Sequence, residues 1–238
     1  MDLIIYHKGC PDGFCAAYVA NKKYPQAELY PTAYGETVPD FLIEGSDVLV
    51  VDFSWPRAVT DRFAGLAKSF FILDHHKTAE AELAGLPYAK FDMNRSGAGL
   101  TWDFMFPDLP RPWYVDYVED RDLWRHKLSF SKEVSAFIMS FPLTLESWDI
   151  LTKQTLDLAM LGGEGILRHI EGNYVQKVLA ERQQGNLDGY TVSMVNAAYP
   201  NISEVGNELT GFGEIGVGYF ERGDGKLQFS LRSVGDVD

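Results

Sequence analysis

The stretch that decides the fold is "FFILDHHKTAE", residues 70–80, in which four apolar residues are followed at once by Asp74, His75 and His76. A continuous apolar run of this length is typical of a strand that is buried on both faces of a parallel sheet. Ligands of open α/β sheets bind beyond the carboxyl ends of the strands, and an acid with two imidazoles stands at that end here. The stretch therefore predicts a parallel sheet and a functional site at its edge.

Similar apolar runs alternate with segments of helical composition through the first half of the chain. The run 47–54, for example, contains Val48, Leu49, Val50 and Val51 in a row. This alternation predicts an α/β fold in which helices cover both faces of a parallel sheet. The expected strands are 3–7, 47–54, 70–74 and 88–92, and the expected helices are 13–24, 56–69 and 96–106.

The pattern changes after about residue 130. Residues 143–161 and 163–185 indicate helices, 190–198 a strand, and 214–234 a hairpin whose turn is "RGDG". With 238 residues, of which 46% are apolar, the chain is long enough for two domains. We expect a parallel-sheet domain over 1–128, a helical connector over 129–185 and a smaller β-rich α+β domain over 186–238.

The composition excludes several classes of protein. The 34 acids and 21 bases give a formal charge of −13, and such a surface repels long nucleic acid. Two cysteines, Cys10 and Cys15, make no disulfide framework. The start "MDLIIYHKGC" does not resemble a signal peptide, and no stretch approaches the roughly 20 apolar residues that span a bilayer. We expect a soluble cytoplasmic protein that binds neither a membrane nor long duplex nucleic acid.

Metal-binding side chains follow three of the expected strands. His7 ends the first strand, with Asp12 just beyond it, Asp52 follows the second, and 74–76 end the third. A lone Asp there is often a turn former or a helix cap, but three strand ends with the same character favour a cluster. Clustered carboxylates repel one another unless cations neutralise them, and mixed Asp and His ligands suit Mn²⁺ or another divalent metal. Two such metals bridged by a carboxylate would hydrolyse phosphoesters.

Four motifs in order give the sequence a resemblance to a known family. They are "YHKGCPDGFCAA" (6–17), "VVDFS" (50–54), "ILDHHKT" (72–78) and "YVEDRDLW" (117–124). Together they resemble the motifs of the DHH phosphoesterases, and the third motif is the most specific. The remainder is similar to the start of the DHH-associated C-terminal domain, with "FSLRS" (229–233) like one of its strands, which favours the nuclease-like branch. The resemblance assigns the catalytic, metal-binding role to 1–128 and substrate binding to 186–238.

The resemblance implies two Mn²⁺ ions per chain, with Mg²⁺ or another divalent metal as the alternative. By the same resemblance Asp52 bridges the two metals, and His7 binds the first. Asp12, His75 and Asp120 complete the second metal site.

The catalytic residues that the resemblance implies are His76 and Asp74. His76 is expected to face the substrate phosphate, and Asp74 to orient an imidazole and so fix its tautomer. The nucleophile is expected to be a water molecule acidified by the two cations, which attacks phosphorus in line.

The first motif departs from the family pattern at Cys10. Family members usually have His, three residues, Asp, one residue and Asp, whereas Cys10 here replaces the first Asp and stands one residue closer to His7. A thiolate binds divalent metals but suits softer ions than Mn²⁺. Cys10 is therefore either a metal ligand that alters the first site or an inert small residue in the turn.

Substrate-binding residues are expected in two further places. Ser96 and Gly97 begin an expected helix, whose exposed amides favour an anion, although a simple cap is the favoured explanation of Ser96. The family's glycine-rich segment followed by His has no counterpart up to Asp238, which leaves Arg232 as the candidate phosphate contact in the last domain. Asp122 is expected to pair with a neighbouring arginine.

These patterns favour a metal-dependent phosphodiesterase or phosphohydrolase that acts on short oligonucleotides or nucleotides. One alternative is a nucleotide-binding module without catalysis, whose first metal site is impaired by Cys10. Another is a single-strand exonuclease whose full-length chain supplies a substrate clamp. The sequence leaves the oligomeric state open, with a homodimer among the alternatives.

Overall fold

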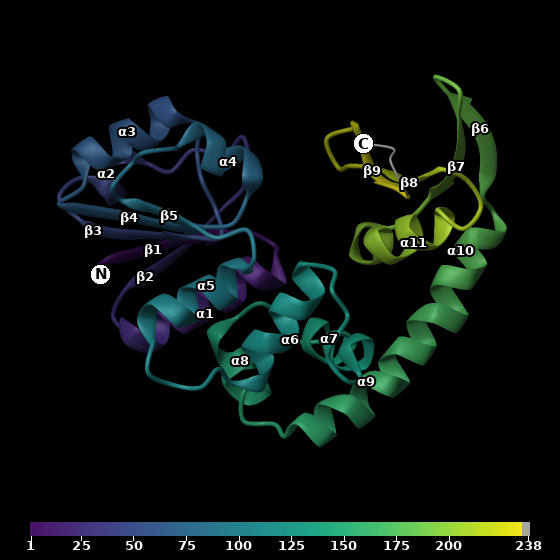
Figure 1. Ribbon diagram of the computed structural model, residues 1–238, viewed down its shortest axis with the longest axis horizontal. Coiled ribbons are helices and arrows are strands. Elements are labelled where there is room, and N and C mark those ends of the chain that lie inside the picture. The colour runs from purple at the N-terminus through teal and green to yellow at the C-terminus, as the bar shows by residue number, and fades with distance from the viewer. Residues whose placement is uncertain (235–238) are drawn as a thin grey trace. The chain divides into compact units, whose positions relative to one another are not determined.

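The computed structural model describes residues 1–234, which form parts of two compact units, Met1–Glu164 and Gly165–Asp238 (Figure 1). Each unit has its own sheet and its own core. The expected division into 1–128, 129–185 and 186–238 stays a prediction, and its final residues 235–238 lie outside the described part.

The first unit is built on a parallel sheet with the strand order β2-β1-β3-β4-β5 among the described residues. Each neighbouring pair runs parallel, and Val51 lies between Tyr6 of one neighbour and Leu73 of the other. All carboxyl ends therefore meet at one edge. The strands are β1 (Leu3–His7), β2 (Glu28–Thr32), β3 (Asp47–Val51), β4 (Ser69–Asp74) and β5 (Ala89–Phe91).

Helices cover both faces of this sheet, as Figure 1 shows. Alternate strand residues face opposite sides: Ile4 and Leu49 pack with α1 and α5, whereas Leu3 and Val48 pack with α2 and α3. Each fully buried aliphatic side chain contributes about 1.5–3 kcal/mol to folding. The helices are α1 (Pro11–Lys23), α2 (Asp40–Ile43), α3 (Arg57–Leu66), α4 (Lys77–Glu82) and α5 (Gly97–Met105).

A helical layer completes the first unit beside α1. Trp148 of α8 is fully buried and packs edge-on against Phe14 and at a tilt against Tyr18 of α1, so this layer shares the core of the sheet domain. The helices are α6 (Trp113–Asp122), α7 (Ser131–Met139), α8 (Leu145–Leu151) and the part of α9 (Leu156–Ile170) up to Glu164, where the first unit ends.

The second unit holds a mixed sheet with the order β6-β7-β8-β9 among the described residues. The middle pair is parallel and the two outer pairs are antiparallel. Val205 and Leu209 of α11 belong to the core of this unit. Its elements are η1 (Glu171–Val175), α10 (Gln176–Ala180), β6 (Gln183–Leu187), β7 (Tyr190–Asn196), η2 (Tyr199–Asn201), α11 (Ile202–Leu209), β8 (Ile215–Glu221) and β9 (Leu227–Ser233).

This architecture confirms the expected fold class, an α/β parallel sheet followed by helices and a smaller β-rich α+β part. The hairpin expected over 214–234 is β8 and β9. Several elements, among them β2, α7 and α11, have no counterpart among the expected segments. The strand β2 is short, partly exposed and contains Pro31, which a sheet tolerates on an edge strand. Within residues 1–234, no helix has the length and apolar character needed to cross a bilayer.

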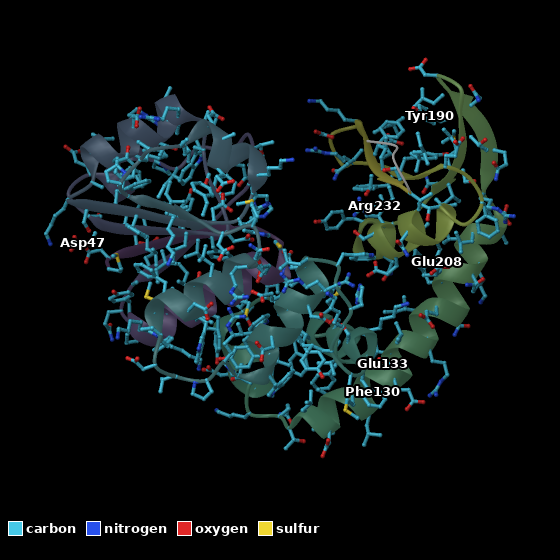
Figure 2. The ribbon with its side chains drawn as sticks, viewed as in Figure 1. Asp47, Phe130, Glu133, Tyr190, Glu208 and Arg232 are labelled. Carbon is cyan, nitrogen blue, oxygen red and sulfur yellow. The ribbon has the colours of Figure 1, made fainter. Side chains whose placement is uncertain are left out.

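The close packing of α9 on α7 generates a stability prediction. A methyl group at Gly163 would collide with the carbonyl of Glu133 (labelled in Figure 2), whereas one at Gly165 would meet only the Arg168 side chain, at an ordinary contact distance of 4.0 Å. We expect Gly163→Ala to lower the free energy of unfolding by about 1–3 kcal/mol through overpacking. Gly165→Ala should raise it by up to about 1 kcal/mol, because alanine favours the helix. Urea denaturation checks both, and equal effects of the two substitutions would contradict the packing.

Candidate metal centre

The carboxyl edge of the first sheet gathers the predicted metal ligands. His7 is the last residue of β1, Asp52 directly follows β3, and Asp74 ends β4 with His75 and His76 after it. The parallel register places these strand ends side by side. The topology that buries the strands therefore also brings the polar residues together.

The carboxylate of Asp52 lies at the centre of the group. Its Oδ1 is 3.1 Å from Nε2 of His75, and its Oδ2 is 3.7 Å from Nδ1 of His7. Asp52 is only 1% exposed, and within residues 1–234 its Oδ2 has no hydrogen-bond partner. A buried carboxylate oxygen without a partner is costly, and a cation would satisfy it. The two oxygens thus face two different donor groups, as a bridging carboxylate requires.

Two glycines make room for Asp52. Its backbone is left-handed, with φ of 55°, which is uncommon for a residue with a side chain. A Cβ at Gly13 would lie 2.6 Å from the carbonyl oxygen of His7 and 3.0 Å from Oδ2 of Asp52. A Cβ at Gly97 would collide with the Asp52 side chain itself. Both helices that begin here, α1 and α5, can approach the carboxylate only because these positions are glycine.

Asp12 occupies the amino end of α5. Its Oδ2 accepts a hydrogen bond of 2.6 Å from the Gly97 amide, and its Oδ1 accepts one of 3.0 Å from the Ala98 amide. The Ser96 hydroxyl accepts from the Gly99 amide and is the N-cap of the helix. Free amides and the helix dipole at such an end stabilise an anion, and here the anion is the protein's own carboxylate.

This arrangement corrects the expectation that Ser96 and Gly97 bind substrate. Ser96 is fully buried and caps α5, and the Gly97 amide is already bonded to Asp12. The amides that the sequence offered to a substrate anion are therefore used inside the protein. The helix start does bind a carboxylate, as the sequence pattern indicates. The sequence could not show that this group belongs to the protein itself.

The ligand atoms form groups small enough to hold cations. Nε2 of His75 lies 3.7 Å from Asp12 Oδ2 and 3.6 Å from Asp122 Oδ2. Among the described residues, three sets have one ligand atom per residue within 4.8 Å of one another. The sets are His7, Cys10 and Asp52; Asp52, His75 and His76; and Asp12, His75 and Asp122.

The structure places Asp122, not Asp120, in this cluster. Asp120 accepts hydrogen bonds from the amides of Lys127 and Leu128 and from the hydroxyl of Ser131. Its carboxylate therefore stabilises the turn between α6 and α7 and faces away from the candidate ligands. The expectation for Asp120 needs correction, because residues two apart on a helix lie on different faces. Asp122 takes the place expected for Asp120.

Cys10 lies beside the first group of ligands as the sequence suggested. Its sulfur belongs to the set with His7 and Asp52. Burial, followed by the negative charges of Asp52 and Asp12, raises the pKa of the Cys10 thiol well above its usual range. The thiol therefore stays protonated in the metal-free protein, and only a bound cation would favour the thiolate.

The electrostatics of the cluster shift the pKa values of its acids in opposite directions. Burial alone would raise the pKa of Asp52, but the hydrogen bond with His75 and the nearby His7 imidazole outweigh it and lower the pKa to about 2. Burial and the Asp52 charge raise the pKa of Asp122 to about 6, and the same two causes raise that of Asp12 well above its usual range. Three carboxylates in one place resist full ionisation, and a cation bound among them would offset this repulsion.

His76 is held differently from His75. Its Nδ1 lies 2.7 Å from Oδ1 of Asp74, and Oδ2 of Asp74 accepts a hydrogen bond of 2.6 Å from Ser54. The hydrogen bond to Asp74 raises the pKa of His76 to about 9 despite partial burial. Asp74 is fully buried and therefore fixes the orientation of the His76 ring, which agrees with the orienting role expected for it.

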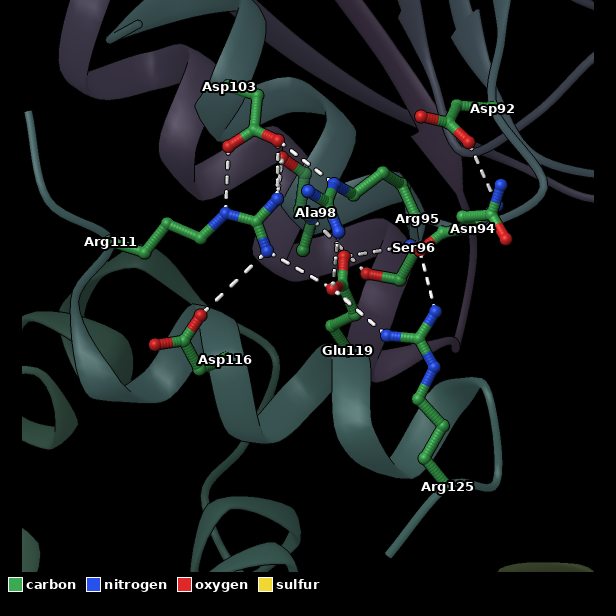
Figure 3. Close-up of polar contacts among 12 residues, drawn as sticks. Asp92, Asn94, Arg95, Ser96, Ala98, Asp103, Arg111, Asp116, Glu119 and Arg125 are labelled. Carbon is green, nitrogen blue, oxygen red and sulfur yellow. Dashed lines mark hydrogen bonds and ion pairs between the residues drawn. The ribbon is translucent and has the colours of Figure 1, made fainter. Parts of the chain in front are cut away.

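A buried carboxylate next to the cluster ties α6 to α5 (Figure 3). Glu119 is 5% exposed, and its Oε2 accepts a hydrogen bond of 3.2 Å from the Ser96 amide. Its Oε1 pairs with Arg111 at 3.1 Å and with Arg95 and Arg125 at 3.5 Å. Three guanidinium groups offset the cost of burying this acid. The amino end of α5, which holds Asp12, is thus fixed from its other side.

Arg232 belongs to the second unit (Figure 2). It lies on β9 and donates hydrogen bonds to the Ser203 hydroxyl at 3.1 Å and to the Leu231 carbonyl at 2.8 Å. Its expected contact with a substrate phosphate stays a prediction.

Comparison with known proteins begins with sequence. No family model matches the chain. The uncharacterized protein R106 of Acanthamoeba polyphaga mimivirus is 29% identical over 184 residues. The match covers 67% of this chain and 42% of the viral protein, so the chain spans less than half the length of this curated relative.

Two solved structures share the fold of the chain. RecJ of Thermus thermophilus in complex with Mn²⁺ has a TM-score of 0.57 at 12% identity, covering 99% of this chain and 45% of RecJ. The pGpG-specific phosphodiesterase PggH of Vibrio cholerae has a TM-score of 0.56 at 11% identity, covering 98% of this chain and 83% of PggH. At such identities the likeness concerns the fold alone, and it is consistent with a DHH-like fold.

The two acids of α6 give a prediction about metal binding. We expect Asp122→Asn to weaken binding of one cation by at least about 10-fold, because it removes a ligand from the set around His75. Asp120→Asn should leave metal affinity unchanged and lower the melting temperature, because it weakens three hydrogen bonds in the α6–α7 turn. Calorimetric titration with Mn²⁺ and thermal melts separate the two effects. If Asp120→Asn weakened metal binding and Asp122→Asn did not, Asp120 and not Asp122 would be the metal ligand.

The raised pKa values of Asp122 and His75 predict how metal binding depends on pH. Both groups hold protons to higher pH in the metal-free protein than they would in water, and a cation must displace those protons. Mn²⁺ affinity should therefore fall as the pH drops through about 6, and binding should release protons. Titrations in two buffers of different ionisation enthalpy measure this release. No proton release at about pH 6 would contradict the shifts.

Proposed function

We propose that this chain is a divalent-metal-dependent phosphohydrolase of the DHH type that acts on phosphoester bonds of short oligonucleotides or nucleotides. The observation that carries the proposal is the buried carboxylate of Asp52. It directs one oxygen to His75 and the other, which has no hydrogen-bond partner among the described residues, to His7. Such a bridging carboxylate is the feature that pairs two cations in phosphoester hydrolases.

The shared fold supports the proposal independently of the side chains. The neighbours with this fold include a pGpG-specific phosphodiesterase and RecJ, which was solved with Mn²⁺. The order of the four sequence motifs agrees with the same interpretation. We extend the reaction class, hydrolysis of phosphate esters, to this chain as part of the proposal.

The donor set fits two Mn²⁺ ions, with Mg²⁺ or another divalent metal as the alternative. His7 and Asp52 would hold the first, with Cys10 as an additional donor, and Asp52 with Asp12, His75 and Asp122 would hold the second. Bound cations of this kind lower the pKa of a water ligand and polarise phosphoryl oxygens. Imidazole and carboxylate donors suit Mn²⁺, whereas a thiolate suits softer metals.

The role proposed for His76 follows from its partner. Asp74 accepts from Nδ1 and so leaves Nε2 of the ring to face a substrate. With a pKa of about 9 the imidazole is protonated at neutral pH and can donate a charged hydrogen bond to a phosphate oxygen. His76 would thus offset charge on the phosphate without acting as a metal ligand.

Charge favours a short substrate. The chain carries a formal charge of −13, so a long polyanion meets repulsion outside the immediate site. A nucleotide or short oligonucleotide places few phosphates near the protein, and the cations can neutralise those. A single-strand exonuclease is the alternative if a longer chain adds a basic clamp. A non-catalytic nucleotide-binding module is the second alternative, favoured by the protonated Cys10 thiol in the first set.

We expect Mn²⁺-dependent release of mononucleotide from a 5′-phosphorylated dinucleotide. Asp52→Asn should lower this activity by roughly 100-fold or more, because it removes the bridging charge, and so exceed the roughly 10–100-fold effect typical of residues outside the ligand set. Liquid chromatography of the products measures the rate. Asp47→Asn, at the opposite end of β3, is the matched control and should leave the rate unchanged.

The outcomes separate the hydrolase from the binding module and test the role of Asp52. Turnover that needs Mn²⁺ and is lost in Asp52→Asn supports the hydrolase. Bound metal and bound nucleotide without turnover favour the binding module. Turnover that persists in Asp52→Asn would overturn the proposed role of this carboxylate.

A further inference from the structure

An exposed aromatic side chain, Tyr34, stands at the rim of the metal centre. It lies in the loop that follows β2, at the same carboxyl edge of the sheet as the candidate ligands. Its ring centroid is 5.5 Å from that of His7 and 6.3 Å from that of His76. Yet the residue is 60% exposed, which is unusual for a large aromatic that already contacts three other rings.

The contacts of Tyr34 fix its ring in place. Phe53, which is 1% exposed, packs against it with a centroid distance of 4.9 Å and an angle of 37°. This tilted contact and the edge contacts with the two imidazoles fix the position of the Tyr34 ring. Because the residue is nevertheless 60% exposed, a large part of the aromatic side chain stays open to solvent beside the centre.

The loop that carries Tyr34 is itself held by hydrogen bonds. The Glu36 amide donates to the Ala33 carbonyl at 3.0 Å, and the Glu36 carboxylate accepts from the Ala33 amide at 3.2 Å and from Lys8 at 2.8 Å. Gly35 supplies the left-handed backbone that the turn needs, with φ of 87°. Tyr34 is therefore placed before any ligand binds, and little conformational entropy is lost when something packs on it.

We propose that Tyr34 is the stacking platform for the base of a nucleotide whose phosphate lies at the metal centre. Every nucleobase has a planar π face, and stacking on an exposed aromatic ring binds bases with little regard to their sequence. An inorganic phosphate or polyphosphate has no group to occupy this face. The inference rests on the proposed function and narrows its substrate class to compounds that carry a base.

Three other aromatic side chains of the unit do not offer the same surface. Tyr114 and Tyr117, in the segment with the highest aromatic density, are buried in the core. Phe41 of α2 is more exposed than Tyr34, at 75%, but no ring contact involving it appears among the described residues. Phe41 is therefore a suitable control for a general effect of losing an exposed aromatic.

The test compares two ligands that differ only in the base, AMP and ribose 5-phosphate. Their dissociation constants are measured by calorimetry with Mn²⁺ present, for the natural protein and for Tyr34→Leu, Tyr34→Phe and Phe41→Leu. We expect the natural protein to bind AMP roughly 10-fold more tightly than ribose 5-phosphate. Tyr34→Leu should bring the two constants within about 2-fold of each other, whereas Tyr34→Phe and Phe41→Leu keep the preference. Metal content and circular dichroism confirm that each variant is loaded and folded.

The readout here is a dissociation constant and not a rate of hydrolysis, so this test and that of the hydrolase can fail separately. A preference for AMP that depends on Tyr34, in a protein that hydrolyses nothing, would support the platform and remove the hydrolase. An unchanged preference in Tyr34→Leu would overturn the platform. So would equal binding of AMP and ribose 5-phosphate, or binding of neither, in the natural protein.

Discussion

The interaction on which the site depends is the bonding of the Asp12 carboxylate to the amino end of α5. Two amides of that helix, from Gly97 and Ala98, donate to it across a large separation in the sequence. The contact fixes α1 against α5 and presses Gly97 onto Asp52. One buried carboxyl group thus positions both the helix and the central carboxylate. The helix dipole stabilises the charge that a cation later needs.

The second constraint is electrostatic. Asp12, Asp52 and Asp122 surround His75, and burial works against ionising all three acids. Protons held by Asp122 and His75, whose pKa values are raised, reduce this repulsion when no cation is bound. Cations would reduce it more completely, so the folded chain and the metals stabilise each other. On the other side of the amino end of α5, three arginines neutralise the buried acid Glu119, and this network holds the helix end in place.

The sequence predicted most of the scaffold because apolar runs that end in polar residues leave few alternatives to a parallel sheet. It placed His7, Asp52 and His75 correctly at one edge, since strand ends follow from topology. The sequence did not predict the residues whose role depends on contacts between distant parts of the chain. The sequence alone does not distinguish Asp120 from Asp122. They are distinguished by the hydrogen bonds that Asp120 makes within the turn after α6. Edge strand β2 is partly exposed and contains Pro31, so it lacks the continuous apolar run that marks the central strands, and no motif marked Tyr34 after it.

Gly13 and Gly97 affect how sequence variants of this chain should be interpreted. Neither has a side chain, a charge or a proton to give, and each would pass as unimportant in a search for reactive groups. Yet a methyl group at either position would press on Asp52 or on the strand end before it. A natural variant that replaces one of them with alanine would look conservative in a genome, and it would nevertheless be expected to inactivate the centre as thoroughly as the loss of a ligand.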